Sequence, residues 1–203
     1  MHTGLKAPTG SLLYALPSIL KPLVLCDLFE ESRPLEVELG CGDATFLVRY
    51  AQDHPEHNFI GVERLLGRIQ KLDRKGRRAG LRNLRGIRIE SCYFLTYLLP
   101  PHSAVALHVY FPDPWPKRKH LKNRMVNLQF PDLAAQALAP GGTVHLRTDH
   151  REYFEQMREV FAGNAAFRPA QTPIELSALL TDFEEEFARK GLQTFRAAYQ
   201  RST

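Results

Sequence analysis

Five acidic residues stand at or just beyond the ends of short apolar runs, and their types and spacing suit them to ligand chemistry. They are Glu38, Glu63, Glu90, Asp113 and Asp149. In a doubly wound sheet, ligands bind outside the carboxyl ends of the strands, so residues at these positions face a common site. Carboxylates there can accept hydrogen bonds from hydroxyl groups or attract a cationic group. The pattern predicts one ligand site at this edge of a sheet.

The first two acids flank a glycine turn. Glu38 precedes Gly40 and Gly42, and such glycines let the backbone approach a nucleoside, while an acid at Glu63 can accept bonds from both ribose hydroxyls. NAD fits poorly, because Thr45 stands where a third glycine is expected and Glu38 would face a pyrophosphate. The same Glu38 suits the ammonium and sulfonium charges of S-adenosylmethionine. The turn therefore predicts a methyltransferase rather than a dehydrogenase.

Each of these residues also has a purely structural interpretation. Glu63 can be an ordinary strand-end carboxylate, Glu90 a solvated residue, and Asp149 the N-cap of the helix that follows it. The aromatic residues Phe111 and Trp115 can serve packing rather than the stacking of a base. These alternatives stay open on the sequence alone.

Hydrophobic periodicity predicts the elements that position these residues. Alternating strands and helices predict a Rossmann-like α/β fold, a doubly wound, mostly parallel sheet with helices on both faces. Three prolines within residues 112–116 predict a rigid loop after the fourth strand. We expect strands at 35–39, 58–62, 85–89, 104–111, 143–147 and 193–199, and helices at 21–30, 44–52, 65–79, 91–99, 122–138, 152–161 and 176–188.

Positive charge is concentrated in two segments of a chain whose formal net charge is +5. Residues 64–88 contain many arginines and lysines against the single acid Asp73, and residues 117–124 contain no acid. A solvated basic face would explain either segment, but two dense segments in a small protein favour a polyanionic partner.

Other features exclude several classes of protein. The chain has three cysteines, too few and too scattered for a disulfide framework or a zinc site, so we expect buried, reduced thiols and no metal. No apolar stretch approaches the roughly 18 residues of a membrane span, and the first ten residues lack the apolar core of a signal peptide. These features predict a cytoplasmic protein without membrane attachment.

Several motifs in order, from about residue 35 to 195, resemble the single-chain bacterial type of the tRNA (guanine-N7)-methyltransferase family. The most specific is Phe111-Pro-Asp-Pro-Trp-Pro-Lys117, and Glu38-Leu-Gly-Cys-Gly and Thr181-Asp-Phe-Glu184 accompany it. The resemblance implies S-adenosylmethionine as cofactor and a variable-loop guanine of tRNA as target. It implies a cofactor site made of Glu38, Gly40, Gly42, Glu63, Glu90, Ser91 and Asp113, and a guanosine site made of Lys117, Asp149, Thr181, Asp182, Phe183 and Glu184.

The chain departs from the family pattern in a few places. The family usually has Asp or Asn where Glu90 stands, with the small residue Ser91 after it, and has a lysine where Asp182 stands. An acid at that point argues against a phosphate contact there. An arginine-rich N-terminal arm is also missing, since Lys6 is the only basic side chain other than histidine before Lys21.

The expected organisation is one domain over residues 1–203, with an N-terminal extension at 1–34 and a core at 35–203 that ends in a substrate-binding segment. We expect a monomer or a weak homodimer that binds tRNA. Two other functions stay open. One is a methyltransferase for exocyclic amino groups of nucleic acids, because such enzymes also bind their target with a proline-flanked polar residue. The other is a noncatalytic RNA-binding module.

The expected reaction needs no general base, because guanine N7 carries a lone pair and no proton. The enzyme has to align the reactants and favour the positive charge that grows on the purine. Asp113 is the first candidate for that role and Glu184 the second. Lys117, on the same loop as Asp113, is expected to hold a phosphate or ribose of the target nucleotide.

Overall fold

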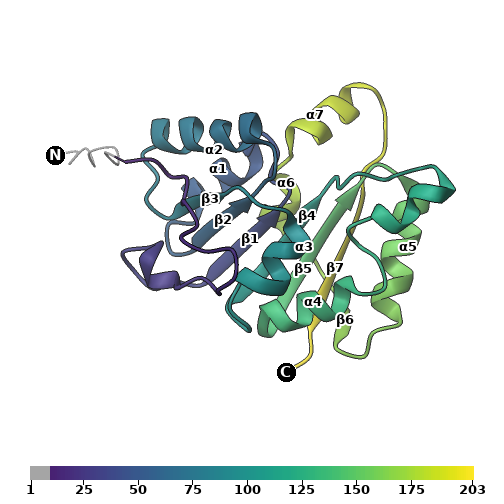
Figure 1. Cartoon of the computed structure of the whole chain (residues 1–203). Coiled ribbons are helices and arrows are strands. Elements are labelled where there is room, and N and C mark those ends of the chain that lie inside the picture. The colour runs from purple at the N-terminus through teal and green to yellow at the C-terminus, as the bar shows by residue number, and fades with distance from the viewer. Residues whose placement is uncertain (1–9) are drawn as a thin grey trace.

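The computed structural model describes residues 10–203, and seven strands form one sheet in the order β3-β2-β1-β4-β5-β7-β6 (Figure 1). The first five strands pair in parallel, whereas β7 runs antiparallel to both β5 and β6. The expected Rossmann-like, mostly parallel sheet is confirmed. The strands are β1 (Leu35–Leu39), β2 (Asn58–Val62), β3 (Leu84–Ile87), β4 (Ala104–Tyr110), β5 (Leu138–Thr148), β6 (Phe167–Ala170) and β7 (Phe195–Arg201).

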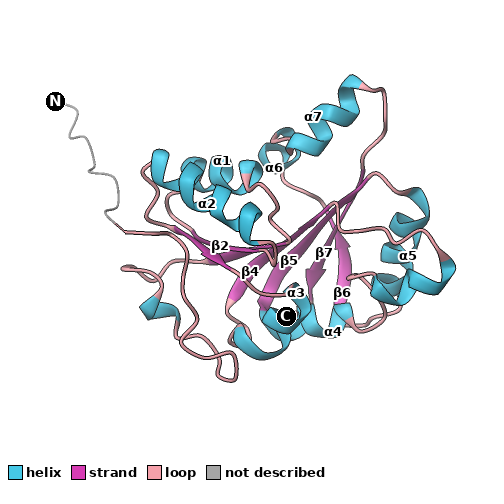
Figure 2. Cartoon of the chain, turned by 45° about the horizontal axis from the view of Figure 1, so that its top comes forward, coloured by secondary structure: helices cyan, strands magenta, loops and turns pink. Residues whose placement is uncertain are grey.

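Helices cover both faces of this sheet. Figure 2 shows α1 and α2 on one face and α3, α4 and α5 on the other. The α-helices are α1 (Thr45–Asp53), α2 (Leu66–Arg78), α3 (Ser91–Tyr93), α4 (Phe130–Ala137), α5 (Arg151–Ala162), α6 (Ile174–Ala178) and α7 (Asp182–Arg189). A π-helical turn, η2 (Phe94–Leu98), continues α3, and η1 (Leu25–Asp27) and η3 (Arg118–Asn123) are 3₁₀ turns.

Alternation along the strands divides the core into two clusters, one on each face. In β2, Phe59 packs with the α1 and α2 side chains Leu47 and Leu72, whereas its neighbour Ile60 packs in the cluster that contains Phe130 of α4. Both faces of β1 and β2 are buried. Two covered faces leave the carboxyl edge of the parallel strands as the place where ligand-binding loops emerge.

The predicted helix at 122–138 is wrong in its first half, where only η3 and a turn precede α4. Pro131 lacks an amide hydrogen and fits only the first turn of a helix, so α4 begins at Phe130. Arg124 adopts an extended backbone and its side chain turns inward, which diverts the chain from a helical path.

The predicted helix at 176–188 is also interrupted, and it forms α6 and α7. Arg147 of β5 donates to the carbonyl oxygens of Leu176 and Leu179, and Thr181 then starts a new helix as its N-cap. Of the helix expected at 21–30, only the 3₁₀ turn η1 forms. The short strand β6 was not predicted.

The cysteines differ from the expected set of buried thiols. All three are free, but only Cys41 is buried, while Cys26 is exposed. Residues 1–9, including Lys6, lie outside the described part of the chain. Within residues 10–203, no helix combines the length and apolar character that crossing a bilayer requires.

A charged network lies inside the sheet, beneath α1. The carboxylate of Glu36 in β1 is 4% exposed and lies 2.5 Å from Nδ1 of His57 and 2.7 Å from Nε2 of His108. The other nitrogen of His108 lies 2.9 Å from the hydroxyl of Tyr110. Although burial opposes ionisation, these two histidines lower the pKa of Glu36 to about 2. The native state therefore favours the Glu36 carboxylate.

Glu36→Gln should lower the free energy of unfolding by about 3 kcal/mol near pH 7, because removing the charge leaves the buried Nε2 of His108 poorly compensated. The folded pKa of Glu36 is depressed, so its contribution is present above the unfolded pKa of about 4.5 and fades as pH falls toward 2. Urea titrations of both proteins should show their difference shrinking over that window. Glu31→Gln is the control, since the Glu31 carboxylate is 70% exposed and pairs only at the surface.

Candidate active site

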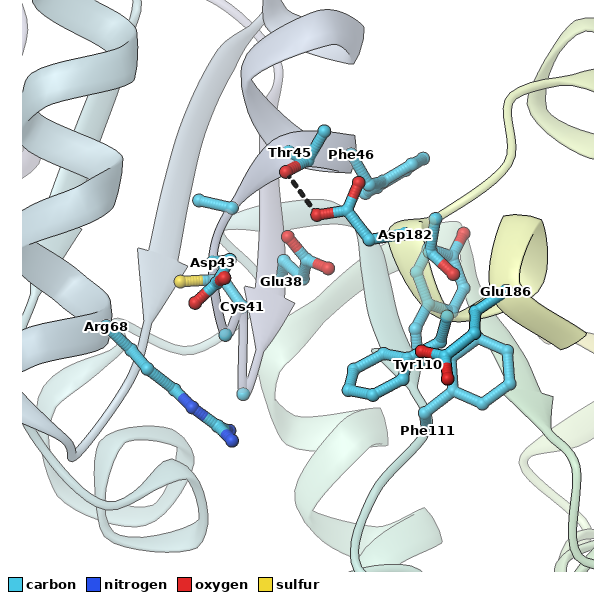
Figure 3. A pocket seen from close by; sticks show the side chains of 15 residues that line it. Glu38, Cys41, Asp43, Thr45, Phe46, Arg68, Tyr110, Phe111, Asp182 and Glu186 are labelled. Atoms are coloured by element: carbon cyan, nitrogen blue, oxygen red, sulfur yellow. Dashed lines mark hydrogen bonds between the residues drawn. The ribbon is translucent and has the colours of Figure 1, made fainter.

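Two adjoining cavities open at the carboxyl edge of the parallel strands. The glycine-loop cavity, of about 270 Å³, contains Glu38 and the turn around Gly42 in its wall (Figure 3). The proline-loop cavity, of about 350 Å³, contains Glu63 and Asp113. Gly40, Arg68, Tyr110 and Phe111 line both cavities, so the two form one cleft.

The glycine turn is built from left-handed backbone. Gly40, Gly42 and Ala44 have φ values of 77°, 51° and 55°, a region that L side chains rarely adopt. The amide of Gly40 donates to the carbonyl oxygen of Val62 in the neighbouring strand, at 2.8 Å. Figure 3 shows Glu38 at the centre of this cavity, between the turn and Asp182. The turn thus delays the start of α1 until Thr45 and leaves space for a ligand above the carboxyl end of β1.

Glu38 is the most unusual acid in the cleft. Its side chain is 4% exposed, and within residues 10–203 its Oε2 atom has no hydrogen-bond partner. Burial raises the pKa of Glu38 to about 8, with Arg147 opposing the rise and the charge of Glu63 adding to it. A buried carboxylate oxygen with no partner, facing a cavity, is suited to a cationic ligand group.

Glu63 organises the loop as well as lining the cavity. It is 7% exposed; its Oε2 accepts from the amide of Gly42 at 3.2 Å, and its Oε1 accepts from the amide of Leu65 at 2.8 Å. Each carboxylate oxygen can accept a second bond. The purely structural interpretation and the ligand-binding one are therefore compatible.

Glu63→Ala should weaken binding of S-adenosylhomocysteine by about 1.5–3 kcal/mol, the range for charge-assisted hydrogen bonds, while the protein stays folded. Calorimetric titration checks this result. Glu56→Ala offers a matched control, because that exposed glutamate lies in the turn before β2 and away from both cavities. Unchanged affinity in folded Glu63→Ala would remove Glu63 from the ligand site.

The structure reverses the two structural interpretations of Glu90 and Asp149, because Glu90 is a helix cap and Asp149 is an exposed residue that does not cap α5. Glu90 caps α3, because its carboxylate accepts from the amides of Cys92 and Tyr93 at 3.0 and 2.7 Å. It also lines the proline-loop cavity, as does the buried Ser91. The expectation that Asp149 caps the following helix is wrong: the cap of α5 is His150, whose Nδ1 accepts from the backbone.

The proline loop carries Asp113 over the second cavity. Asp113 is exposed, and the loop around it contains two left-handed residues, Phe111 with φ 50° and Trp115 with φ 42°. Lys117 and Asp149 are also exposed, and neither lies in the wall of either cavity. The structure thus gathers the expected cofactor residues and leaves these two expected substrate residues farther out.

The segment at the start of α7 forms one wall of the glycine-loop cavity. Thr181, Asp182 and Phe183 line it, and the hydroxyl of Thr45 donates to Asp182 across the cavity at 2.6 Å (Figure 3). Lys75 of α2 also donates to the Thr45 hydroxyl. The acid that replaces the family's lysine is therefore tied to the first turn of α1.

Glu184 lies behind this wall rather than in it. It is 3% exposed; its Oε2 accepts from Arg147 at 2.7 Å and from the amide of Thr181 at 2.9 Å, and its Oε1 accepts from Arg196 at 2.5 Å. These bonds complete a capping box with Thr181. Glu184 therefore fastens the segment to the sheet.

Arg147 is the central residue that the sequence interpretation missed. It is 2% exposed, and its guanidinium carbon lies 4.2 Å from the ring centroid of Tyr110 and 5.5 Å from that of Phe46. The same side chain binds Glu184 and two carbonyl oxygens of the segment at 174–182. An arginine within a predicted strand of the sheet was the available signal, because a buried charge needs several partners.

Comparison with known proteins agrees with this arrangement of residues. A family described as "Putative methyltransferase" matches residues 32–197. A tRNA (guanine-N(7)-)-methyltransferase of Nitrosospira multiformis is 33% identical, over 93% of this chain and 83% of its own length. Those of Sodalis glossinidius and Chromohalobacter salexigens are 35% and 36% identical, over 84% and 86% of this chain and 74% of their own lengths.

The chain belongs to the tRNA (guanine-N7)-methyltransferase family. Solved structures that resemble this methyltransferase agree in fold alone. A 16S rRNA methyltransferase, KamB, superposes with a TM-score of 0.61 at 17% identity, covering 88% of this chain and 93% of its own. A 30S ribosomal A1408 methyltransferase from an uncultured bacterium superposes with a TM-score of 0.60 at 16% identity, covering 87% and 92%.

The residues of the methyltransferase cleft fit S-adenosylmethionine. In the described part of the chain, Oε2 of Glu38 has no partner and suits a cationic group, and each Glu63 oxygen accepts one bond and can accept another from a ribose hydroxyl. Ser91 and the apolar side chain of Ile89 also line the proline-loop cavity. When bound, this cofactor supplies an electrophilic methyl group on a sulfonium.

The basic side chains of the two segments of the methyltransferase differ in their exposure to solvent. Most arginines of α2 and the adjoining loops are exposed, as are Arg118 and Lys119 of η3. Arg124, which the sequence placed among the RNA-facing residues, is 2% exposed, so that expectation is wrong. The exposed basic residues of the first segment are Arg64, Arg68, Arg74, Arg77, Arg78, Arg82 and Arg88.

Proposed function

We propose that this methyltransferase transfers a methyl group from S-adenosylmethionine to N7 of a variable-loop guanine in tRNA. The observation that carries the proposal is a single cleft that joins the Glu38 carboxyl group, whose Oε2 has no partner within residues 10–203, to a proline loop bearing an exposed Asp113. One half of the cleft is suited to the cationic cofactor, and the other presents a carboxylate to the target base. The family membership supports the choice of substrate.

Glu38, Glu63 and the turn at Gly40 and Gly42 are proposed to hold the cofactor, with Glu90 and Ser91 at its adenine end. Glu63 holds the glycine turn through the Gly42 amide. Its remaining lone pairs stay in place for the ribose hydroxyls. This arrangement lowers the cost of ordering the turn on binding.

Asp113 is proposed to act on the target guanine. A carboxylate beside the ring can accept hydrogen bonds from the N1 and N2 protons, which orients N7, and can stabilise the positive charge that grows on the purine. Asp113 also lines the cavity that holds Glu63, so it can touch the cofactor. No side chain has to remove a proton from N7.

The rim residues are proposed to hold the rest of the target nucleotide. The rings of Phe111 and Phe183 lie with centroids 5.6 Å apart and planes tilted by 40°, and Phe183 is 49% exposed, so its free side is proposed to stack on the target base. Lys117 and Asp149 are proposed to bind the phosphate or ribose from the rim. Thr181 and Asp182 complete the wall, and Glu184 acts by keeping that wall in place.

The proposal also covers the domain organisation, location, oligomeric state and tRNA-binding surface of the enzyme. We propose one catalytic domain, working in the cytoplasm as a monomer or weak homodimer, which meets tRNA through the exposed arginines of α2 and η3. The lining residues Arg64 and Arg68 make this basic surface continuous with the cleft.

Identification of the methylated nucleoside tests the function. Purified protein is incubated with unmodified tRNA and methyl-labelled S-adenosylmethionine, and the tRNA is digested and its nucleosides are separated. We expect 7-methylguanosine, and a tRNA whose variable-loop guanine is replaced should accept no label. Label in an exocyclic amino group would support the alternative methyltransferase, and absence of both label and cofactor binding would support a noncatalytic RNA-binding module.

Neutralising an exposed phosphate-contacting arginine, as in Arg118→Ala or Arg74→Ala, should reduce the salt slope of tRNA binding by about one and spare cofactor affinity. Binding measured across a series of salt concentrations gives this slope. Arg158→Ala is the control, since Arg158 is exposed on α5 and pairs with Glu155. An unchanged slope in the Arg74/Arg118 double variant would show that these residues form only a solvated face.

A further inference from the structure

The backbone of the proline loop is strained where it carries the proposed catalytic aspartate. Phe111 and Trp115 both have positive φ values, 50° and 42°, on either side of Asp113. Left-handed conformations of bulky residues persist only when surrounding contacts determine them. Prolines remove amide donors from the loop, so few of its own groups can supply those contacts. Some residue outside the loop has to fix its shape.

Arg124 makes the contact that reaches the centre of this loop. Its Nε donates to the carbonyl oxygen of Pro114 at 2.7 Å, directly between Asp113 and Trp115. The arginine is 2% exposed, which keeps solvent from competing for that bond. A buried, charge-assisted hydrogen bond of this kind is among the stronger ones in a protein.

Helix α5 holds Arg124 from the other side. The Nη1 atom donates to Gln156 at 2.6 Å and Nη2 donates to Glu152 at 3.2 Å, while the guanidinium carbon lies 4.8 Å from the ring centroid of Tyr153. Gln156 in turn donates to the carbonyl oxygen of Val126 at 2.9 Å. The guanidinium is therefore locked between α5 and the loop, with every nitrogen engaged.

We propose that Arg124 is a positioning residue that transmits the rigidity of α5 to the loop carrying Asp113. The inference rests on the proposed function, since it concerns the placement of the proposed catalytic carboxylate. It separates Arg124 from its exposed neighbours Arg118 and Lys119. Those two side chains are free to meet RNA, whereas the polar atoms of Arg124 are directed at Pro114, Glu152 and Gln156.

The chain provides a direct probe of this loop, because Trp115 is its only tryptophan. Two variants weaken the lock: Arg124→Lys keeps the charge but loses the planar fork, and Gln156→Met removes the α5 partner, which lies outside both cavities. Acrylamide quenching of Trp115 should increase about twofold in each. Arg158→Lys, on the exposed face of the same helix, should leave the quenching unchanged.

Kinetics then connect the loop to the reaction. At saturating tRNA and cofactor, single-turnover methyl transfer should fall on the order of tenfold or more in both variants, because a small misplacement of a catalytic group is costly. The KM for tRNA should change less than threefold, and the salt slope of tRNA binding should stay as in the unaltered enzyme. In the Arg124→Lys/Gln156→Met double variant the losses should combine less than additively, as expected for residues of one network.

Wild-type quenching or wild-type rates in both folded variants would overturn the proposal. A lowered salt slope with an intact rate would overturn it as well, by assigning Arg124 a phosphate contact. If the unaltered enzyme fails to methylate tRNA, the proposed function falls, and the Trp115 measurement still decides whether Arg124 fixes the loop.

Discussion

Asp113→Asn should slow methyl transfer on the order of a hundredfold or more, the loss expected when one preorganised electrostatic contact to the transition state is removed. The substitution keeps the size of the side chain and removes its charge. Because Asp113 is exposed at the mouth of the cleft, the protein should fold normally. Single-turnover rates with saturating cofactor and tRNA measure the effect without interference from product release.

Two further variants sharpen this expectation. Asp113→Glu should also be slow, since the extra methylene displaces the carboxylate within a loop that prolines and Arg124 hold rigid. Asp27→Asn serves as the control, because Asp27 lies in η1 and lines neither cavity. Full activity of Asp113→Asn at saturating cofactor would exclude Asp113 from the chemistry and leave it as a cavity residue.

S-adenosylhomocysteine should bind about tenfold more tightly for each pH unit between pH 6 and 7.5. Burial raises the pKa of Glu38 to about 8, so the free protein holds a proton there over this range. A ligand ammonium favours the carboxylate, and binding therefore expels that proton. Linkage then requires affinity to rise with pH until the free carboxyl group ionises unaided.

Calorimetry in two buffers of different ionisation enthalpy should detect release of up to one proton per ligand bound near pH 7. Glu38→Gln should abolish the pH dependence and weaken binding near pH 7.5 by about 1.5–3 kcal/mol, the range for a charge-assisted hydrogen bond. Glu175→Gln is a suitable control, since Glu175 is exposed on α6. The assignment fails if affinity stays flat with pH in the unaltered protein.

Local patterns were enough to predict the fold class. All six expected strands recur in the structure, and the central parallel ones are the continuous apolar runs that a sheet covered on both faces requires. The acids at strand ends were equally predictable, since parallel strands that end at one edge must bring their following residues together. Glu38, Glu63, Glu90 and Asp113 do line one cleft.

Tertiary contacts decided what the same patterns left ambiguous. The periodicity at 122–138 and 176–188 is helical. Arg124 and Arg147 nevertheless donate to carbonyl oxygens and acids of distant elements, and these bonds hold part of each segment in a non-helical conformation. Nothing near these arginines in the sequence reveals partners such as Gln156 or Glu184, more than 30 residues away.

The difference between what the sequence predicted and what only the structure decided has one physical cause. Which residue types reach the edge of the sheet depends on local periodicity, so the sequence alone determined that acids gather at one ligand-binding edge. How each charge is used depends on burial and on partners brought from elsewhere in the chain. Only the tertiary structure showed that Oε2 of Glu38 has no partner among residues 10–203, that Glu184 is held by two arginines, and that the buried Arg124 donates to the proline loop.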